Sequence, residues 1–196
     1  MNIVALLTSF IYLVSSSLLL PMLLLLSLLT IWLVVYSGSF FALWLARKRI
    51  QSPVNAIESL QARRFDEFSG PVRAFSRAFV QARQAAMADV AVINLLRDTE
   101  HRMWRSLDRL KLLIRIGPGL GLIGTLIPMG TGLASLSQGD LTRLSGDLVI
   151  AFTTTVVGLT IGLLSYFFFT IQRRWVEEDM KNMELLCEVS MREGNA

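Results

Sequence analysis

Apolar residues are massed in long blocks along this chain, two of which, 112–136 and 148–171, lie close together. These two blocks have 25 and 24 residues, and each is long enough to cross a hydrocarbon core of roughly 30 Å as a slightly tilted helix. Only the 11 residues 137–147 separate them. The pattern therefore predicts a transmembrane helical hairpin whose two outer ends lie on the same side of the membrane.

The first apolar block begins at the N-terminus, and residues 1–46 contain no charged side chain. A single helix of that length would far exceed the thickness of the bilayer core. Ser15–Ser17 and Pro21 predict a break, which divides the block into an apolar or interfacial helix at 1–18 and a span at 19–46. A fourth span formed by residues 2–17 is the alternative, and three spans are favoured because 2–14 is short.

The segments between and after the spans have helical patterns with long apolar stripes. Ser52-Pro53 and Ser69-Gly70-Pro71 predict helix starts. No Gly or Pro occurs between Val72 and Ile116, which allows one long helix that continues into the second span. The fold class is thus an all-α polytopic membrane protein with three transmembrane helices, or four, and long cytoplasmic helical extensions. The predicted stripe before the second span is Val72, Phe75, Phe79, Ala82, Ala86, Val90, Ile93, Leu96, Trp104, Leu107 and Leu110; the soluble segments are 47–111 and 172–196, the latter with Met180, Met183, Leu186 and Val189.

Charge gives the orientation of the spans. Of the 19 Lys and Arg residues, 18 lie at 47–49, in 63–115 or after 172, and only Arg143 lies in the hairpin loop 137–147. The positive-inside rule places that outer loop and the N-terminus outside and the C-terminus in the cytoplasm. The net charge of +4 and the pI near 9.7 are better explained by topology and anionic lipid than by nucleic acid. One cysteine and one histidine exclude a disulfide, a Cys-rich metal site and a His cluster.

Glycines and prolines occur at several positions in the two hairpin spans. Residues 119–124 match G-x-G-x-x-G, but the match lies inside an apolar span without the strand and helix that a dinucleotide site requires. Small residues at four-residue spacing instead predict close helix packing, and prolines predict kinks or hinges where neighbouring groups re-satisfy the backbone. The candidate packing and hinge residues are Pro118, Gly121, Gly124, Pro128, Gly158 and Gly162.

Hydroxyl groups are the main polar content of the hairpin: Thr125, Thr131 and the run Thr153-Thr154-Thr155. Any one of them can bond its own helix, but three in succession cannot all face lipid, so at least one is expected at a protein interface or a hydrated path. No charged residue or histidine lies in the centre of a span, so a titratable relay group must come from a partner. Asp147, at the outer start of the third span, is the nearest acidic candidate, and stabilisation of a helix N-terminus is the simpler explanation for it.

An intramembrane enzyme is not favoured, because no catalytic or metal-ligating set occurs at membrane depth. We expect no enzymatic activity and no cofactor. Two other classes remain: an ion channel subunit, and a membrane scaffold or sensor whose glycine and threonine surfaces only pack helices. The discriminating feature is a single-span partner with an intramembrane Asp, which would favour the channel.

The residues Gly117-Pro118-Gly119-Leu120-Gly121-Leu122-Ile123-Gly124-Thr125-Leu126, followed by Thr155-Val156-Val157-Gly158-Leu159, resemble the second and third spans of the MotA/TolQ/ExbB proton channel family. The resemblance implies a stator-like subunit of an energy-coupling molecular motor in the inner (cytoplasmic) membrane. It implies a homopentamer around an ExbD/TolR/MotB-like partner, whose membrane aspartate carries the ion. By position, Thr125 and Thr155 match pore-facing threonines and Pro118 matches the family's proline.

One position departs from the resemblance. ExbB-like and TolQ-like members have a glutamate about five residues before the third-span threonine, where this chain has Ile150. Asp147, about one turn earlier, is the candidate substitute. The run Thr153-Thr154-Thr155 leaves Na⁺ open beside H⁺ as the transported ion, with Thr153, Thr154 and Thr155 joining Thr125 as candidate pathway residues.

Overall fold

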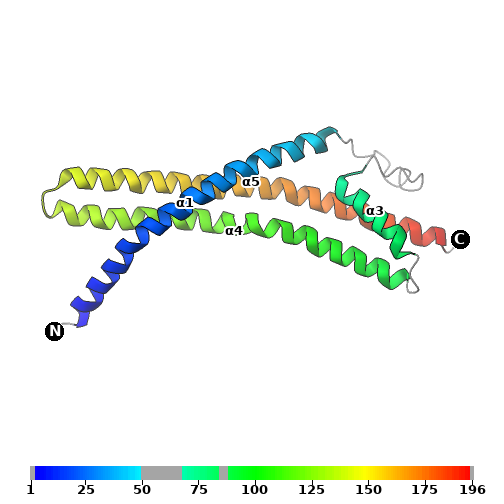
Figure 1. Ribbon diagram of the computed structural model, residues 1–196, viewed down its shortest axis with the longest axis horizontal. Helices are drawn as coiled ribbons and strands as arrows, with labels where there is room; N and C mark the ends of the chain where they lie inside the picture. The colour runs from blue at the N-terminus through cyan, green and yellow to red at the C-terminus, as the bar shows by residue number, and fades with distance from the viewer. Residues whose placement is uncertain (1–2, 50–67, 84–87, 195–196) are drawn as a thin grey trace. The chain divides into compact units, whose positions relative to one another are not determined.

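A computed structural model describes residues 3–49, 68–83 and 88–194, and all regular elements in these ranges are helices (Figure 1). The helices are α1 (Ile3–Arg49), α3 (Gly70–Ala82), α4 (Ala88–Leu136) and α5 (Leu141–Gly194). Three of them contain stretches long and apolar enough to cross a membrane: Ser17–Arg47, Val90–Leu136 and Leu141–Ser190. The predicted all-α polytopic membrane fold is confirmed.

The chain divides into two compact units, and α1, α4 and α5 each contribute to both. The hairpin unit comprises Met1–Ser37 and Leu110–Phe167, and the tail unit comprises Gly38–Arg109 and Phe168–Ala196. The hairpin unit holds the apolar antiparallel pair formed by α4 and α5, and the tail unit holds α3 and the amphipathic parts of the long helices.

Helix α1 is continuous for 47 residues, with Pro21 inside it. The break predicted near Ser15–Pro21 is wrong. Proline removes a single backbone donor from the helix, and membrane helices tolerate that loss; the hydroxyl of Ser17 also bonds the Leu13 carbonyl of its own helix, at 2.9 Å. Because the chain does not reverse direction here, the four-span alternative is wrong as well.

The hairpin closes in a tighter turn than the sequence pattern predicts. Helix α4 ends at Leu136 and α5 begins at Leu141, so residues up to 147 that we assigned to the outer loop are helical. Gly139 adopts a φ of 76°, a conformation that glycine accepts without strain. The Asp140 carboxylate then accepts the backbone N–H of Arg143 at 3.0 Å. This is the helix-start role that we expected of Asp147.

The amphipathic segment before the second span is not one long helix. Helix α3 ends at Ala82, and α4 begins at Ala88. Val72 of α3 and Leu107 of α4 belong to one buried cluster, whereas a straight helix would hold them about 50 Å apart. The chain therefore folds back so that both apolar stripes are buried together. The helix predicted from Ser52 onward lies outside the described residues.

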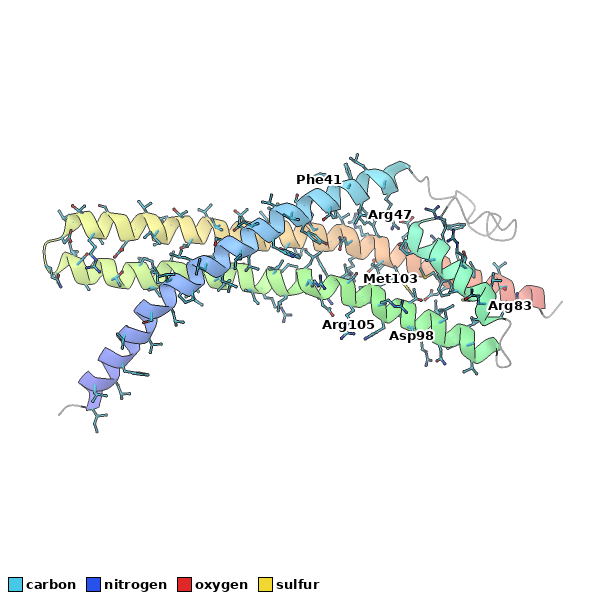
Figure 2. The ribbon with its side chains drawn as sticks, in the orientation of Figure 1. Phe41, Arg47, Arg83, Asp98, Met103 and Arg105 are labelled. Carbon is cyan, nitrogen blue, oxygen red and sulfur yellow. The ribbon has the colours of Figure 1, made fainter. Side chains whose placement is uncertain are left out.

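The core of the tail unit is built from α3, α4 and α5. Five of the eleven predicted stripe residues are buried and three are partly buried. Val90 and Ile93 are 54% and 43% exposed, whereas Val92, which was not predicted, is buried at 4%; Ala86 lies outside the described residues. Met103 packs against this core, while Asp98 and Arg105 lie on the exposed side of α4 (Figure 2). The buried cluster contains Phe68, Val72, Phe75, Phe79, Val92, Leu107, Val176, Met180, Met183, Leu186 and Cys187.

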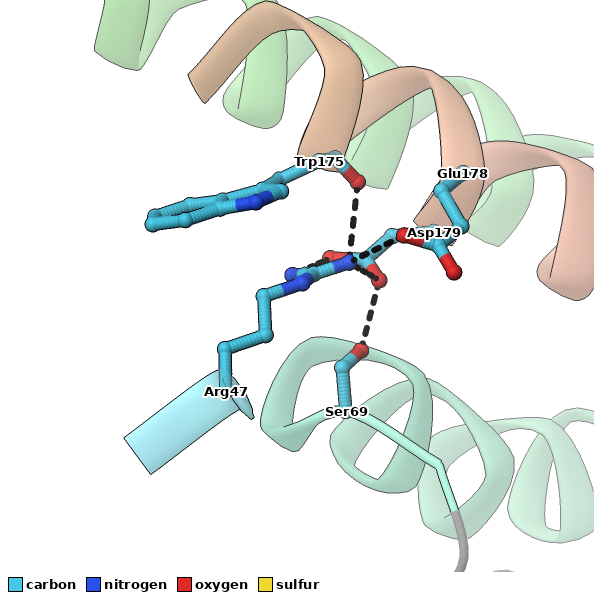
Figure 3. A network of polar contacts seen from close by, with 5 residues as sticks. All are labelled: Arg47, Ser69, Trp175, Glu178 and Asp179. Carbon is cyan, nitrogen blue, oxygen red and sulfur yellow. Dashed lines mark hydrogen bonds and ion pairs between the residues drawn. The ribbon is translucent and has the colours of Figure 1, made fainter. Parts of the chain in front are cut away.

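An ion-pair network joins three parts of the tail unit (Figure 3). The guanidinium of Arg47 donates to both carboxylate oxygens of Asp179, at 2.6 and 2.9 Å, and the Ser69 hydroxyl donates to the same carboxylate at 2.7 Å. The Arg47 guanidinium also lies 5.3 Å from the centroid of the Trp175 ring, and Phe40 stacks on that ring. The Asp179 side chain is 3% exposed, so its charge is compensated inside the protein.

Candidate functional site: the glycine–threonine seam

Helices α4 and α5 approach each other closely along a line of small residues, which we call the seam: Gly117, Gly121 and Gly124 against Thr154, Gly158 and Gly162. A Cβ built on Gly158 would lie 2.6 Å from the Gly121 Cα and 2.7 Å from the Gly117 carbonyl oxygen. Such distances leave no space for a side chain. The glycines thus bring the two backbones into direct contact, as small residues do in membrane helices.

The two prolines of α4 lie beside this seam. The Pro118 ring faces Gly162, where a Cβ would lie 2.8 Å from the proline Cγ. Pro118 has no N–H to donate to the Ile114 carbonyl. Ser165, in the following turn of α5, is fully buried, and among the described side chains its Oγ is a buried polar atom without a hydrogen-bond partner. Pro128 is also fully buried.

The three consecutive threonines of α5 occupy three different environments. Thr154 lies in the seam with 6% exposure, and a Cβ on Gly124 would come within 2.7 Å of its hydroxyl oxygen. Thr155 is half-buried and Thr153 is exposed. Successive residues of a helix are about 100° apart, so Thr153 and Thr155 flank the seam on opposite sides.

Thr125 of α4 is half-buried and follows the seam residue Gly124, just as Thr155 follows the seam residue Thr154. Because the two helices are antiparallel, the residue after a contact position points to the same side of the pair on both helices. The structure therefore brings Thr125 and Thr155 to one side of the hairpin and places Thr153 on the other.

The hydroxyls of Thr125 and Thr155 donate their protons within their own helices. Thr125 Oγ1 donates to the Leu122 carbonyl at 2.7 Å, and Thr155 Oγ1 donates to the Ala151 carbonyl at 3.2 Å. A hydroxyl has one proton and two lone pairs. Both threonines consequently present acceptor lone pairs, which suit a cation or the O–H of a protonated acid.

Asp147 also lies between α4 and α5, two turns outward of Thr154 on the same face of α5. The Thr131 hydroxyl donates to Asp147 Oδ2 at 2.8 Å. Sequence reasoning counted Thr131 only as polar content and did not pair it with Asp147. The spacing holds a signal, since Thr131 follows Gly124 by seven residues and Asp147 precedes Thr154 by seven, so the two must meet if Gly124 faces Thr154.

The sequence profile of the MotA/TolQ/ExbB proton channel family matches residues 69–185, which is more than half of the chain. The chain belongs to this family. No curated protein and no solved structure matches it significantly. The match covers both spans of the hairpin and the whole seam, as well as α3 and much of the amphipathic part of α5.

Membership of the MotA/TolQ/ExbB family implies a proton channel subunit in general terms. In this member the central part of each span carries no charged side chain, so the seam offers hydroxyl and carbonyl oxygens only. Ile150, at the position where the resemblance led us to look for a glutamate, is 36% exposed. The nearest carboxylate of α5 is instead about one turn further out, at Asp147.

Proposed function

We propose that this protein is the oligomeric channel subunit of an ion-motive-force-driven motor, conducting H⁺ or Na⁺ and transmitting motion to an ExbD/TolR/MotB-like partner. The observation that carries the proposal is the placement of Thr125 and Thr155 on one side of the hairpin. Their acceptor lone pairs match the O–H of a protonated partner aspartate, or a cation bound to that aspartate.

The partner supplies what the spans lack. A membrane aspartate from a single-span helix would be the titratable group, and the two threonines would hold it during ion transfer. Exposed apolar residues such as Leu122 and Leu159, at 60% and 55% exposure, flank the threonines and would pack against that helix. Several copies of this chain, five in our proposal, surround the partner helices in the inner membrane, with the N-terminus outside and the C-terminus cytoplasmic.

Replacing Thr155 with valine should lower ion flux about tenfold or more, because the isosteric side chain removes one hydrogen bond to a charged or acidic group. Flux would be measured in vesicles that contain this protein and its partner. Thr160→Val is the matched control, because the Thr160 hydroxyl is exposed and donates to the Val156 carbonyl of the same helix at 2.7 Å. Equal flux in both variants and the unaltered protein would contradict the role of Thr155.

The oligomeric part of the proposal has its own measurement. Native mass spectrometry of the purified assembly should give five copies of this chain together with the partner. A monomer, or a ring that conducts no ions when the partner is present, would favour a scaffold or sensor whose seam serves packing alone.

A further inference from the structure

Asp147 is a carboxylate set into the transmembrane hairpin. Between Arg115 and Arg173 the chain has three charged residues, and two of them, Asp140 and Arg143, are exposed at the outer turn. Asp147 is half-buried against α4. Charged side chains within spans are costly and usually mark ion or substrate pathways. The N-cap of α5 is already supplied by Asp140, so the start of the helix does not account for Asp147.

The Asp147 carboxylate accepts a hydrogen bond from the Thr131 hydroxyl. Among the described residues no basic side chain forms an ion pair with it, including Arg143 on its own helix. The described part of α1 in the hairpin unit has no charged side chain, and the basic residues of α4 in that unit, Lys111 and Arg115, are at least 16 residues from Thr131 along the helix. That spacing corresponds to about 24 Å.

The Thr131 hydroxyl stands between two acceptors. Its Oγ1 lies 2.8 Å from Asp147 Oδ2 and 3.0 Å from the Pro128 carbonyl oxygen. A hydroxyl has one proton, and that proton can be donated fully to only one of the two acceptors at a time. An ionised Asp147 carboxylate attracts the proton more strongly than the Pro128 carbonyl does. Neutralising Asp147 would release the hydroxyl proton to the Pro128 carbonyl.

Gly132 lets the carboxylate approach α4. A Cβ at this position would lie 3.3 Å from the Asp147 Cβ and 3.1 Å from the Leu144 Cδ1, both tighter than ordinary contacts. The absence of a side chain therefore keeps Asp147 beside Thr131 and the Pro128 carbonyl. Three oxygens of the kinds that hard cations prefer come together at one level of the hairpin.

We propose that Asp147 and Thr131 form an outward-facing acceptor site for the transported monovalent cation, H⁺ or Na⁺, ahead of Thr125 and Thr155. This inference rests on the proposed function and names the first site of its pathway. As a proton site, Asp147 binds H⁺ at Oδ2, and Thr131 turns its own proton to Pro128 and accepts the new O–H. As a sodium site, the ion binds the Asp147 carboxylate and the Thr131 oxygen, with the Pro128 carbonyl as third ligand.

Cation occupancy can be measured directly with dicyclohexylcarbodiimide, an apolar reagent that adds to protonated carboxyl groups. The full-length protein would be treated in lipid vesicles from about pH 5 to about pH 8, and peptide mass spectrometry would compare Asp147 with the exposed Asp140. We expect Asp147 to react several-fold faster. Protection of Asp147 by added Na⁺ at constant pH identifies a sodium site, and a faster reaction of Asp147 than of Asp140 that Na⁺ does not change identifies a proton site. Reaction no faster than that of Asp140 under every condition would overturn the proposal.

Flux in partner-containing vesicles separates this inference from the proposed function. Asp147→Asn and Thr131→Val should each lower flux about tenfold or more, Thr131→Ser should restore it by keeping the hydroxyl, and Asp140→Asn should leave it unchanged. If Thr155→Val lowers flux while Asp147→Asn does not, the acceptor site is refuted and the channel function stands. If neither variant alters flux, the channel function itself fails.

Discussion

Replacing Arg47 with alanine should destabilise the tail unit by about 3–5 kcal/mol, because the substitution leaves a buried carboxylate without its cation. Asp179 is 3% exposed and receives two hydrogen bonds from Arg47. Among the described side chains, the Ser69 hydroxyl would remain as a hydrogen-bond donor to the charged group. The lost contact of Arg47 with the Trp175 ring adds to the cost.

The single cysteine gives a clean readout of this change. Cys187 is a buried member of the same core, with 6% exposure, and a thiol reagent reaches it only when the tail unit opens. Maleimide labelling of Cys187 should therefore become roughly a hundredfold faster or more in Arg47→Ala. Labelling at the rate of the unaltered protein would show that the network contributes little to stability.

Arg173→Ala is the matched control for Arg47→Ala. Arg173 pairs with Glu177 one turn along α5 at 2.8 Å, and both side chains are about half exposed. Such a surface pair contributes about 0.3–0.5 kcal/mol, so labelling of Cys187 should change little. Arg47→Lys should fall between the two variants, because it keeps the charge and loses the two-pronged hydrogen bonding. An equal effect of Arg173→Ala would mean that any lost arginine loosens the unit.

The spans and the C-terminal helix could be predicted because their signals are local. Long apolar blocks mark the hairpin whatever lies beside it, and the burial of Met180, Met183 and Leu186 follows from helical spacing alone. The end of the first span at residue 46, just before Arg47, could be predicted from the apolar block. The ion pair of Arg47 could not be predicted, because Asp179 is 132 residues away in the chain and no local pattern connects the two.

The errors came where tertiary packing overrides a local signal. Pro21 favours a helix break in water, but an apolar helix keeps its remaining hydrogen bonds in lipid. The residues between Val72 and Ile116 include no Gly or Pro, yet burying both stripes in one core requires the chain to fold back. At the seam, glycine spacing predicted contact between the spans but left their register undetermined. The pairing of Thr131 with Asp147 depends on that register.

Replacing Gly158 with alanine should separate the two spans of the hairpin. The added Cβ would lie 2.6 to 2.8 Å from the backbone atoms of Gly121 and Gly117, and backbone cannot rotate away as a flexible side chain can. We expect a destabilisation of about 1–3 kcal/mol or more from overpacking. Alanine otherwise favours a helix over glycine by about 0.8–1.0 kcal/mol, so a loss of stability would have to come from the contact itself.

Gly146→Ala supplies the control in the same helix, because a Cβ there would meet no atom within 4 Å. It should leave stability unchanged or raise it, while Gly158→Ala lowers it, as judged by thermal unfolding in matched detergent. If the same glycine-to-alanine change lowers stability at position 158 and does not lower it at position 146, the effect comes from the contact at the seam. Gly158→Ala should also lower ion flux, because separating α4 from α5 displaces Thr125 relative to Thr155. Normal stability and flux in Gly158→Ala would contradict both the close approach and its use in conduction.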